Sequence, residues 1–189
     1  MAFVLLSRAI KFLRQPSKAM GKERNSPPMQ ALHYLLAMLI LYSVLRAMAD
    51  AFFVLLVPDI DIVRFLIFMP PLHFLKALTA TAANVLFFHS MAYVLGAKEP
   101  VGQSFKVVVY GLTPFWLLGW TPLIELGFIG LVFTVWTGYL MVKGAEKLLN
   151  LSPRKAILTW ILSLFLLHMS LQLIEPYWPT PSPLYLTAP

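Results

Sequence analysis

Long apolar stretches alternate along this chain with short segments that are polar and mostly basic. Four of the apolar stretches cover residues 31–57, 72–95, 123–142 and 153–174, and each is about as long as a membrane-crossing helix, which needs about 20 residues. A fifth stretch, residues 105–120, is shorter and contains a proline. The pattern predicts an all-α, polytopic integral membrane bundle of five transmembrane helices.

The N-terminal residues 1–30 follow a different pattern. Between residues 3 and 13 the apolar positions share one helical face, and Arg8, Lys11 and Arg14 lie on the opposite face. Such an interfacial, amphipathic helix is suited to an anionic membrane surface, so we expect these three cations to contact anionic lipid. The alternative is a solvated segment whose spacing arises by chance.

Composition supports the membrane assignment. Hydrophobic residues make up 59% of the chain and charged residues 12%, whereas a soluble domain carries about 25% charged residues. No soluble core could bury this much apolar surface. The net charge of +7 would suggest nucleic acid as the partner of a soluble protein. In a membrane protein the positive charge instead sets the orientation of the chain across the membrane, so we expect no nucleic-acid partner.

Lysine and arginine fall almost entirely on one side of the expected bundle. With the N-terminus in the cytoplasm, twelve of them are cytoplasmic, and Arg64 alone lies in an outside loop. The C-terminus is then outside. We expect a multi-pass protein of the cytoplasmic (inner) membrane with three parts: a cytoplasmic helix and linker (1–30), a five-span domain (31–175) and an extracytoplasmic proline-rich tail (176–189).

The segment between the first two spans, residues 58–73, is too short to cross a membrane and too apolar for a simple loop. We expect an interfacial or re-entrant piece that ends at Pro70 and Pro71, because proline removes a backbone donor and clashes with the preceding helical turn.

Arg46 and Asp50 are four residues apart in the first span and share one helical face. A charge inside a bilayer is costly, and pairing is the usual remedy. Two readings follow. The pair is an internal ion pair that lets the helix insert and pack, or it is part of a proton or substrate relay. The second reading makes the chain a small transporter or channel component that uses this pair and the broken third span.

The sequence offers no catalytic motif and no metal-ligand spacing, so we expect no enzyme activity and no cofactor. It has no cysteine, which excludes thiol catalysis and cysteine-based metal sites. His89 and His168 would sit at different depths, so paired ligation of a haem is not expected. A cofactor beside either histidine would instead indicate a subunit of an energy-transducing or pigment complex.

Small residues recur every four positions in the fourth span, at Gly130, Thr134 and Gly138. Such a helix-packing face allows two backbones to approach closely. The third span contains a helix breaker, Pro114. We expect it to kink there and to form a hairpin with the helix that carries this small-residue face.

The run from residue 94 to residue 162 resembles the membrane domain of the Yip (Ypt-interacting protein) family, on the following positions: Gly96, Phe105, Tyr110, Pro114, Trp136, Gly138, Leu151, Ser152, Lys155 and Ala156. The resemblance implies five spans and a cytoplasmic N-terminus. Eukaryotic relatives assemble with one another in Golgi and endoplasmic-reticulum membranes and associate with prenylated small GTPases. With about thirty residues before the first span, this chain is similar to the short prokaryotic form.

Together these observations predict a non-enzymatic membrane protein. We expect a membrane-organising factor or accessory subunit that acts through helix packing and through binding of lipid, other membrane proteins or a second copy of itself.

Overall fold

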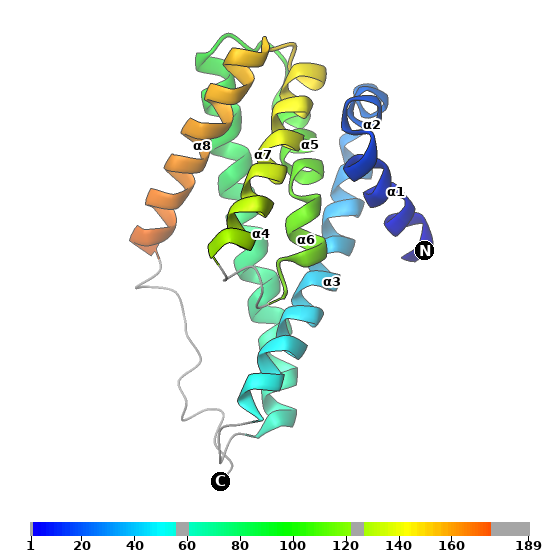
Figure 1. Ribbon diagram of the computed structural model, residues 1–189, viewed down its shortest axis with the longest axis vertical. Coiled ribbons are helices and arrows are strands. Elements are labelled where there is room, and N and C mark those ends of the chain that lie inside the picture. The colour runs from blue at the N-terminus through cyan, green and yellow to red at the C-terminus, as the bar shows by residue number, and fades with distance from the viewer. Residues whose placement is uncertain (1, 56–60, 122–126, 175–189) are drawn as a thin grey trace.

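A computed structural model describes residues 2–55, 61–121 and 127–174, and these residues form helices joined by short connections, with no strand (Figure 1). The helices are α1 (Ala2–Arg14), α2 (Pro16–Glu23), α3 (Pro28–Val54), α4 (Ile62–Val94), α5 (Val101–Gly111), α6 (Thr113–Leu118), α7 (Gly127–Leu148) and α8 (Pro153–Ile174). The all-α prediction is confirmed for this part of the chain. The predicted tail, residues 176–189, lies outside the described residues.

Four of the described helices, α3, α4, α7 and α8, are long and apolar enough to cross a membrane. In their most apolar windows only 11 to 33% of the residues are buried inside the molecule. Large side chains such as Phe128, Phe165 and Leu173 are exposed. An apolar outer surface of this extent suits lipid rather than water.

The prediction for residues 58–73 was wrong in one respect: the chain does not break at Pro70 and Pro71, which lie inside the continuous helix α4. The Asp61 carboxylate accepts hydrogen bonds from the backbone N–H groups of the second and third residues of the helix, 3.0 and 3.2 Å away. Phe65 then packs against Ala51 of α3. This cap and this contact hold the first turns of α4 in place, and membrane helices tolerate interior proline when neighbours support them.

The third apolar stretch is broken, as predicted, but the break comes before Pro114. Helix α5 ends at Gly111, Leu112 lies between the two helices, and Pro114 sits in the first turn of α6. Proline is well suited to a first turn because the backbone donors there have no intrahelical partner. Pro114 therefore starts a new helix instead of bending an existing one.

The third span packs against the helix that carries Gly130 and Gly138, as predicted, because α5 contacts α7, but the contact does not use the predicted small-residue face. A Cβ atom at Gly138 would lie 2.3 Å from the Trp160 ring, so this glycine lets α7 approach α8. Helix α5 meets α7 elsewhere, where Val107 lies against Gly144 and Gly111 lies against Met141. The four-residue spacing revealed a close contact but not which helix makes it.

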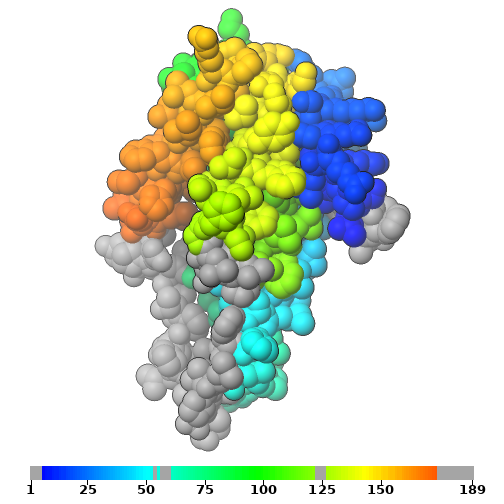
Figure 2. Space-filling view, in the orientation of Figure 1, coloured from blue at the N-terminus to red at the C-terminus, as the bar shows by residue number. Residues whose placement is uncertain are grey.

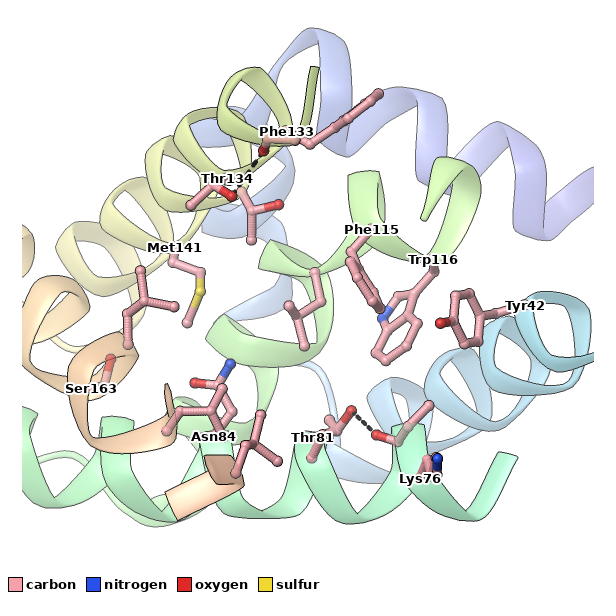
Figure 3. A pocket seen from close by; sticks show the side chains of 18 of the residues that line it. Tyr42, Lys76, Thr81, Asn84, Phe115, Trp116, Phe133, Thr134, Met141 and Ser163 are labelled. Atoms are coloured by element: carbon pink, nitrogen blue, oxygen red, sulfur yellow. Dashed lines mark hydrogen bonds between the residues drawn. The ribbon is translucent and has the colours of Figure 1, made fainter. Parts of the chain in front are cut away.

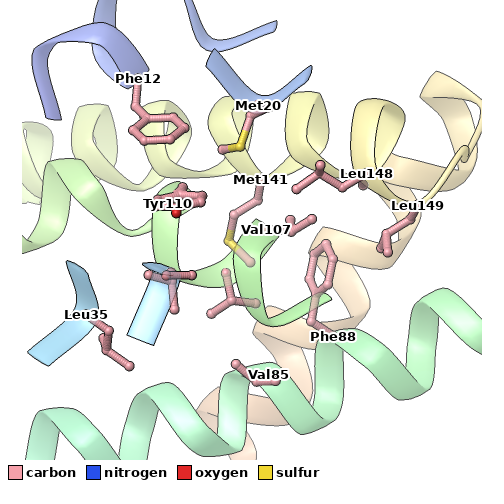
Figure 4. Close-up of a cluster of buried hydrophobic side chains, with 14 of the residues drawn as sticks. Phe12, Met20, Leu35, Val85, Phe88, Val107, Tyr110, Met141, Leu148 and Leu149 are labelled. Carbon is pink, nitrogen blue, oxygen red and sulfur yellow. The ribbon is translucent and has the colours of Figure 1, made fainter. Parts of the chain in front are cut away.

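Helices α1 and α2 lie along one side of the bundle near one of its ends, where α2 contacts α7 and α5 and α1 contacts α6 (Figures 1 and 2). Phe12 from α1 and Met20 from α2 are buried in the main hydrophobic core. Figure 4 shows them above Tyr110 and Val107 of α5, in a cluster that continues to Phe88 of α4. The N-terminal helices are thus part of the folded core rather than an appendage.

We predict opposite effects for alanine at two helical glycines. At Gly138 the added methyl meets a rigid indole ring, and overpacking of this kind costs about 1–3 kcal/mol. At Gly21 nothing lies within 4 Å of the new Cβ, and alanine favours a helix over glycine by about 1 kcal/mol. Thermal unfolding in detergent should show Gly138→Ala less stable than the parent and Gly21→Ala equal or more stable. The α7–α8 contact would be misplaced if both variants unfolded alike.

Candidate functional site

Three connections meet at the end of the bundle that carries α1 and α2. Arg24, just after α2, donates to Asn150 (2.9 Å) in the α7–α8 connection and pairs with Glu99 (3.1 Å) in the α4–α5 connection. Asn150 in turn donates to Glu99 at 2.6 Å. We call this the basic end, because lysines and arginines gather in these connections, in the adjoining helix turns and in α1 and α2: Lys11, Arg14, Lys18, Lys22, Lys98, Lys147, Arg154 and Lys155.

Lys106 of α5 closes the C-terminus of α2. Its side chain is 1% exposed, and its ammonium donates to the backbone carbonyls of Glu23 (2.8 Å), Arg24 (3.3 Å) and Ser26 (2.5 Å). Glu23 is the last residue of α2, and Arg24 and Ser26 follow it, so these carbonyls lie at the negative end of the helix dipole, where a cation is favourable. A buried lysine is thereby fully satisfied by backbone oxygen.

Glu23 is the centre of a second set of contacts. It pairs with Arg8 of α1 at 2.6 Å and accepts hydrogen bonds from Ser26 (2.7 Å) and from the Tyr110 hydroxyl (3.0 Å). The Arg8 guanidinium lies 2.9 Å from the same hydroxyl. We name Arg8, Glu23, Ser26, Lys106 and Tyr110 the clasp, because they join α1 and α2 to α5.

Contacts within the clasp shift the pKa values of two of its groups, Glu23 and Arg8. Burial disfavours the charged form of Glu23, but the hydrogen bonds from Arg8 and Ser26 outweigh it and lower the pKa of the carboxyl below its ordinary value. Burial likewise disfavours the charged form of Arg8, but the hydrogen bond to Glu23 and the nearby negative charge outweigh burial and raise the pKa of the guanidinium above its ordinary value. Both groups are therefore ionised at neutral pH.

Aromatic rings extend the clasp toward the break in the third stretch. Phe12 stacks on Tyr110 with ring centres 4.2 Å apart, and Tyr34 of α3 lies tilted against Tyr110 at 5.3 Å. The Arg8 guanidinium lies 5.3 Å from the centre of the Tyr110 ring, a cation–π distance. The Tyr34 and Thr113 hydroxyls are 3.0 Å apart, and Thr113 donates to the Tyr110 carbonyl at 2.7 Å. This last bond occupies a carbonyl beside the break.

On its outer side the same region carries a groove between α1 and α2 of about 700 Å³. Lys11, Gln15, Lys18 and Lys22 line it. Of the three cations predicted to contact lipid, Arg8 is turned toward Glu23 and Tyr110, whereas Lys11 and Arg14 are exposed. The lipid contact itself stays a prediction.

The intramembrane pair exists and is larger than predicted. Arg46 Nε lies 3.0 Å from Asp50 Oδ1, and His73 Nε2 of α4 lies 2.9 Å from Asp50 Oδ2 without the alignment of a hydrogen bond. Nothing in the sequence marked His73 as a neighbour, because it comes 23 positions after Asp50 and from another helix. Arg46, Asp50 and His73 thus form a row of three charged or titratable side chains across α3 and α4.

A cavity of about 570 Å³ lies between α4, α6, α7 and α8 (Figure 3). It begins beside His73 and Lys76 and extends to Asn84 and Trp160. Gly130 and Thr134 of the predicted packing face line it, so this part of the face borders space instead of a helix. Most of the wall is apolar or aromatic.

The remaining predicted positions have plainer surroundings. Trp136 is 43% exposed on the outer surface of α7, and the Ser152 carbonyl accepts the backbone N–H of Ala156 in the first turn of α8. His89 lies 3.0 Å from the Ser104 hydroxyl, and His168 lies 3.0 Å from Gln172. Within the described ranges no three His, Asp or Glu side chains gather as metal ligands would.

Comparison with known proteins identifies one family. The family described as the Yip1 domain matches residues 10–174, a range that includes the clasp except Arg8, the intramembrane pair and the cavity. Neither the curated proteins nor the solved structures gave a match.

We predict that Glu23→Gln is destabilising at neutral pH and loses this effect in acid. The pKa of Glu23 is lowered in the folded state, so its stabilising contribution is complete above about pH 4.3, the ordinary value for glutamate. It disappears as the pH falls below that value through the lowered pKa, because the carboxyl then becomes protonated. Melting temperatures of the parent and the variant, measured from pH 7 down to pH 3, should converge. A gap that widened on acidification would contradict the clasp.

Proposed function

Because this chain belongs to the Yip1 domain family, a family of membrane proteins, we propose that it is a non-enzymatic membrane-organising factor or accessory subunit. It acts by packing its helices against partners and by binding lipid. In this proposal the protein has five spans, the broken α5–α6 segment being the third. The basic end faces the cytoplasm, and the C-terminus is outside, as the positive-inside rule requires.

The observation that carries the proposal is the basic surface of α1 and α2, held rigidly by the clasp. Phe12 and Met20 anchor the two helices in the core, so the lysines and arginines on their outer side occupy fixed positions at one end of the bundle. A preformed cationic surface beside apolar spans is complementary to a leaflet that contains anionic lipid.

The outer apolar surface supports the second half of the proposal. Helix α7 exposes Phe128, Leu131, Val135 and Tyr139, along with Trp136 of the family resemblance. Lipid can cover such a face, and so can the helix of another membrane protein or of a second copy. We propose such partners in the plane of the membrane.

The transport alternative finds support in the cavity, which reaches His73 beside the Arg46–Asp50 pair. A solute path needs polar groups that replace water along its length. Most of the residues that line this cavity are apolar or aromatic, so its chemistry is that of a lipid-like ligand, and we do not adopt transport as the function.

We expect the surface of α1 to select anionic lipid. The full chain, reconstituted with equal amounts of anionic and zwitterionic phospholipid, should retain more of the anionic kind after purification. Lys11→Gln/Arg14→Gln should lose most of this preference, since each cation near a membrane surface contributes about 1 kcal/mol. Arg154→Gln/Lys155→Gln removes the same charge from the start of α8 and serves as the control. Equal losses in the two double variants would refute a specific role for α1.

We expect the protein to be isolated with partners. After mild extraction, native electrophoresis should give a species larger than the monomer, and mass spectrometry should identify either a constant protein partner or this chain alone as a multimer. Trp136→Ala, on the exposed face of α7, should reduce that species, whereas Phe165→Ala, at an exposed position of α8, is the control and should leave it unchanged. A monomer that carries neither protein nor lipid would exclude the proposed function.

A further inference from the structure

The outer side of α1 and α2 carries two adjoining hollows. One is the groove between the two helices, of about 700 Å³, and the other is a hollow of about 440 Å³ along α1. Ser7, Lys11 and Gln15, spaced four residues apart, line both and form a ridge between them. Volumes of this size are those of small-molecule sites, which measure about 300–1,000 Å³.

The groove has an unbalanced positive charge. Arg8 and Glu23 in its wall pair with each other at 2.6 Å, and the second Glu23 oxygen accepts hydrogen bonds from two hydroxyl groups of the clasp. Every other charged residue of the wall is a lysine that is exposed and whose side chain has no ion pair or hydrogen bond within the described part of the chain: Lys11, Lys18 and Lys22.

These lysines stand on both walls of the groove. Lys11 belongs to α1, whereas Lys18 and Lys22 lie four residues apart on one face of α2. A head group with one negative charge would neutralise one of the three and leave two like charges close together, which repel each other. A head group with two phosphates can be contacted from both walls, and the Gln15 and Gln30 amides add neutral donors.

The second hollow has an apolar lining. Leu6 and Ile10 of α1 line it and are 50% and 40% exposed. A soluble anion bound in the groove would leave these side chains in water, whereas the acyl chains of a lipid would cover them, which is favourable. The two hollows together therefore suit an amphiphile with an anionic head.

The polar and apolar parts also have the order of a lipid in a membrane. Helix α2 leads into the connections of the basic end, and the N-terminal half of α1 reaches α6 (Figure 1). The 11 residues of α5 separate α6 from the basic end and rise about 16 Å, and half the hydrocarbon thickness of a bilayer is about 15 Å. The α2 lysines thus lie toward the membrane surface, and Leu6 and Ile10 lie deeper.

We propose that the groove between α1 and α2 binds the head group of a phospholipid that carries two phosphates, as cardiolipin does. Lys18 and Lys22 contact one phosphate, Lys11 on the facing wall contacts the other, and the acyl chains pass Leu6 and Ile10. Basic pockets on the cytoplasmic side of membrane proteins bind lipids of this kind. The inference rests on the proposed function, in which α1 binds anionic lipid, and names the class of lipid.

The test uses the full chain in mild detergent and counts bound lipids by native mass spectrometry. Cardiolipin is titrated in one series, and phosphatidylglycerol in twice the amount in another, so that both supply equal phosphate. The parent should bind one cardiolipin per chain about tenfold more tightly than phosphatidylglycerol, because the second phosphate arrives on the same molecule.

Three double variants locate the site. Lys18→Gln/Lys22→Gln should weaken cardiolipin binding about tenfold, since it removes both cations of the α2 wall. Lys18→Arg/Lys22→Arg keeps the charge and should bind as the parent does, and so should Arg154→Gln/Lys155→Gln, which removes equal charge outside the groove. All four positions are exposed, so each variant should unfold at the parent temperature when no lipid is added.

The proposal fails if equal phosphate gives equal binding of the two lipids, or if the two glutamine double variants lose cardiolipin equally. Inorganic pyrophosphate, which has two phosphates and no acyl chain, should not displace cardiolipin at the same concentration, and displacement would make the groove a site for a soluble anion instead. Equal binding of phosphatidylglycerol and phosphatidylcholine would refute the lipid part of the proposed function itself. That result is distinct from loss of the cardiolipin preference alone.

Discussion

The structure depends on one constraint: a polar group among apolar helices must find its partner inside the chain, because lipid supplies none. Lys106 satisfies this constraint by donating to three backbone carbonyls at or just after the end of α2. The Thr113 hydroxyl satisfies it by donating to the Tyr110 carbonyl beside the break. Ser43, 1% exposed on α3, donates to the carbonyl one turn earlier. Within the described residues, His73 Nε2 and Trp116 Nε1 are buried without a hydrogen-bond partner, and both residues line the cavity.

The same constraint explains why the N-terminal helices are firmly placed. Arg8 and Glu23 would be costly near the core as single charges. Together with Tyr110 and Ser26 they form a closed set of hydrogen bonds, and the stacked ring of Phe12 excludes water from one side. The polar and the apolar contacts thus involve the same few residues, and together they fix α1 and α2 to the bundle.

The sequence predicted what depends on local pattern. Apolar length gave the long helices, with α8 matching residues 153–174, and the four-residue spacing gave the Arg46–Asp50 pair. The pattern failed where tertiary contacts override it. Two prolines ended a predicted segment, yet Asp61 and Phe65 keep α4 continuous through them. The clasp and His73 were missed because their partners lie 50 or more positions away or on another helix, where periodicity carries no information. Lys106, a lone cation inside an apolar run, was counted only among the twelve cytoplasmic cations, and its burial was not predicted.

The links among Arg24, Glu99 and Asn150 have a mechanical consequence. They fasten three connections at one end of the bundle, while farther along α7 and α8 the cavity lies between them. The described part of the chain is therefore cross-linked between connections at its basic end, whereas the cavity separates α4, α6, α7 and α8 along part of their length. Any force that brings α7 and α8 closer would act on the cavity before it acts on these cross-links.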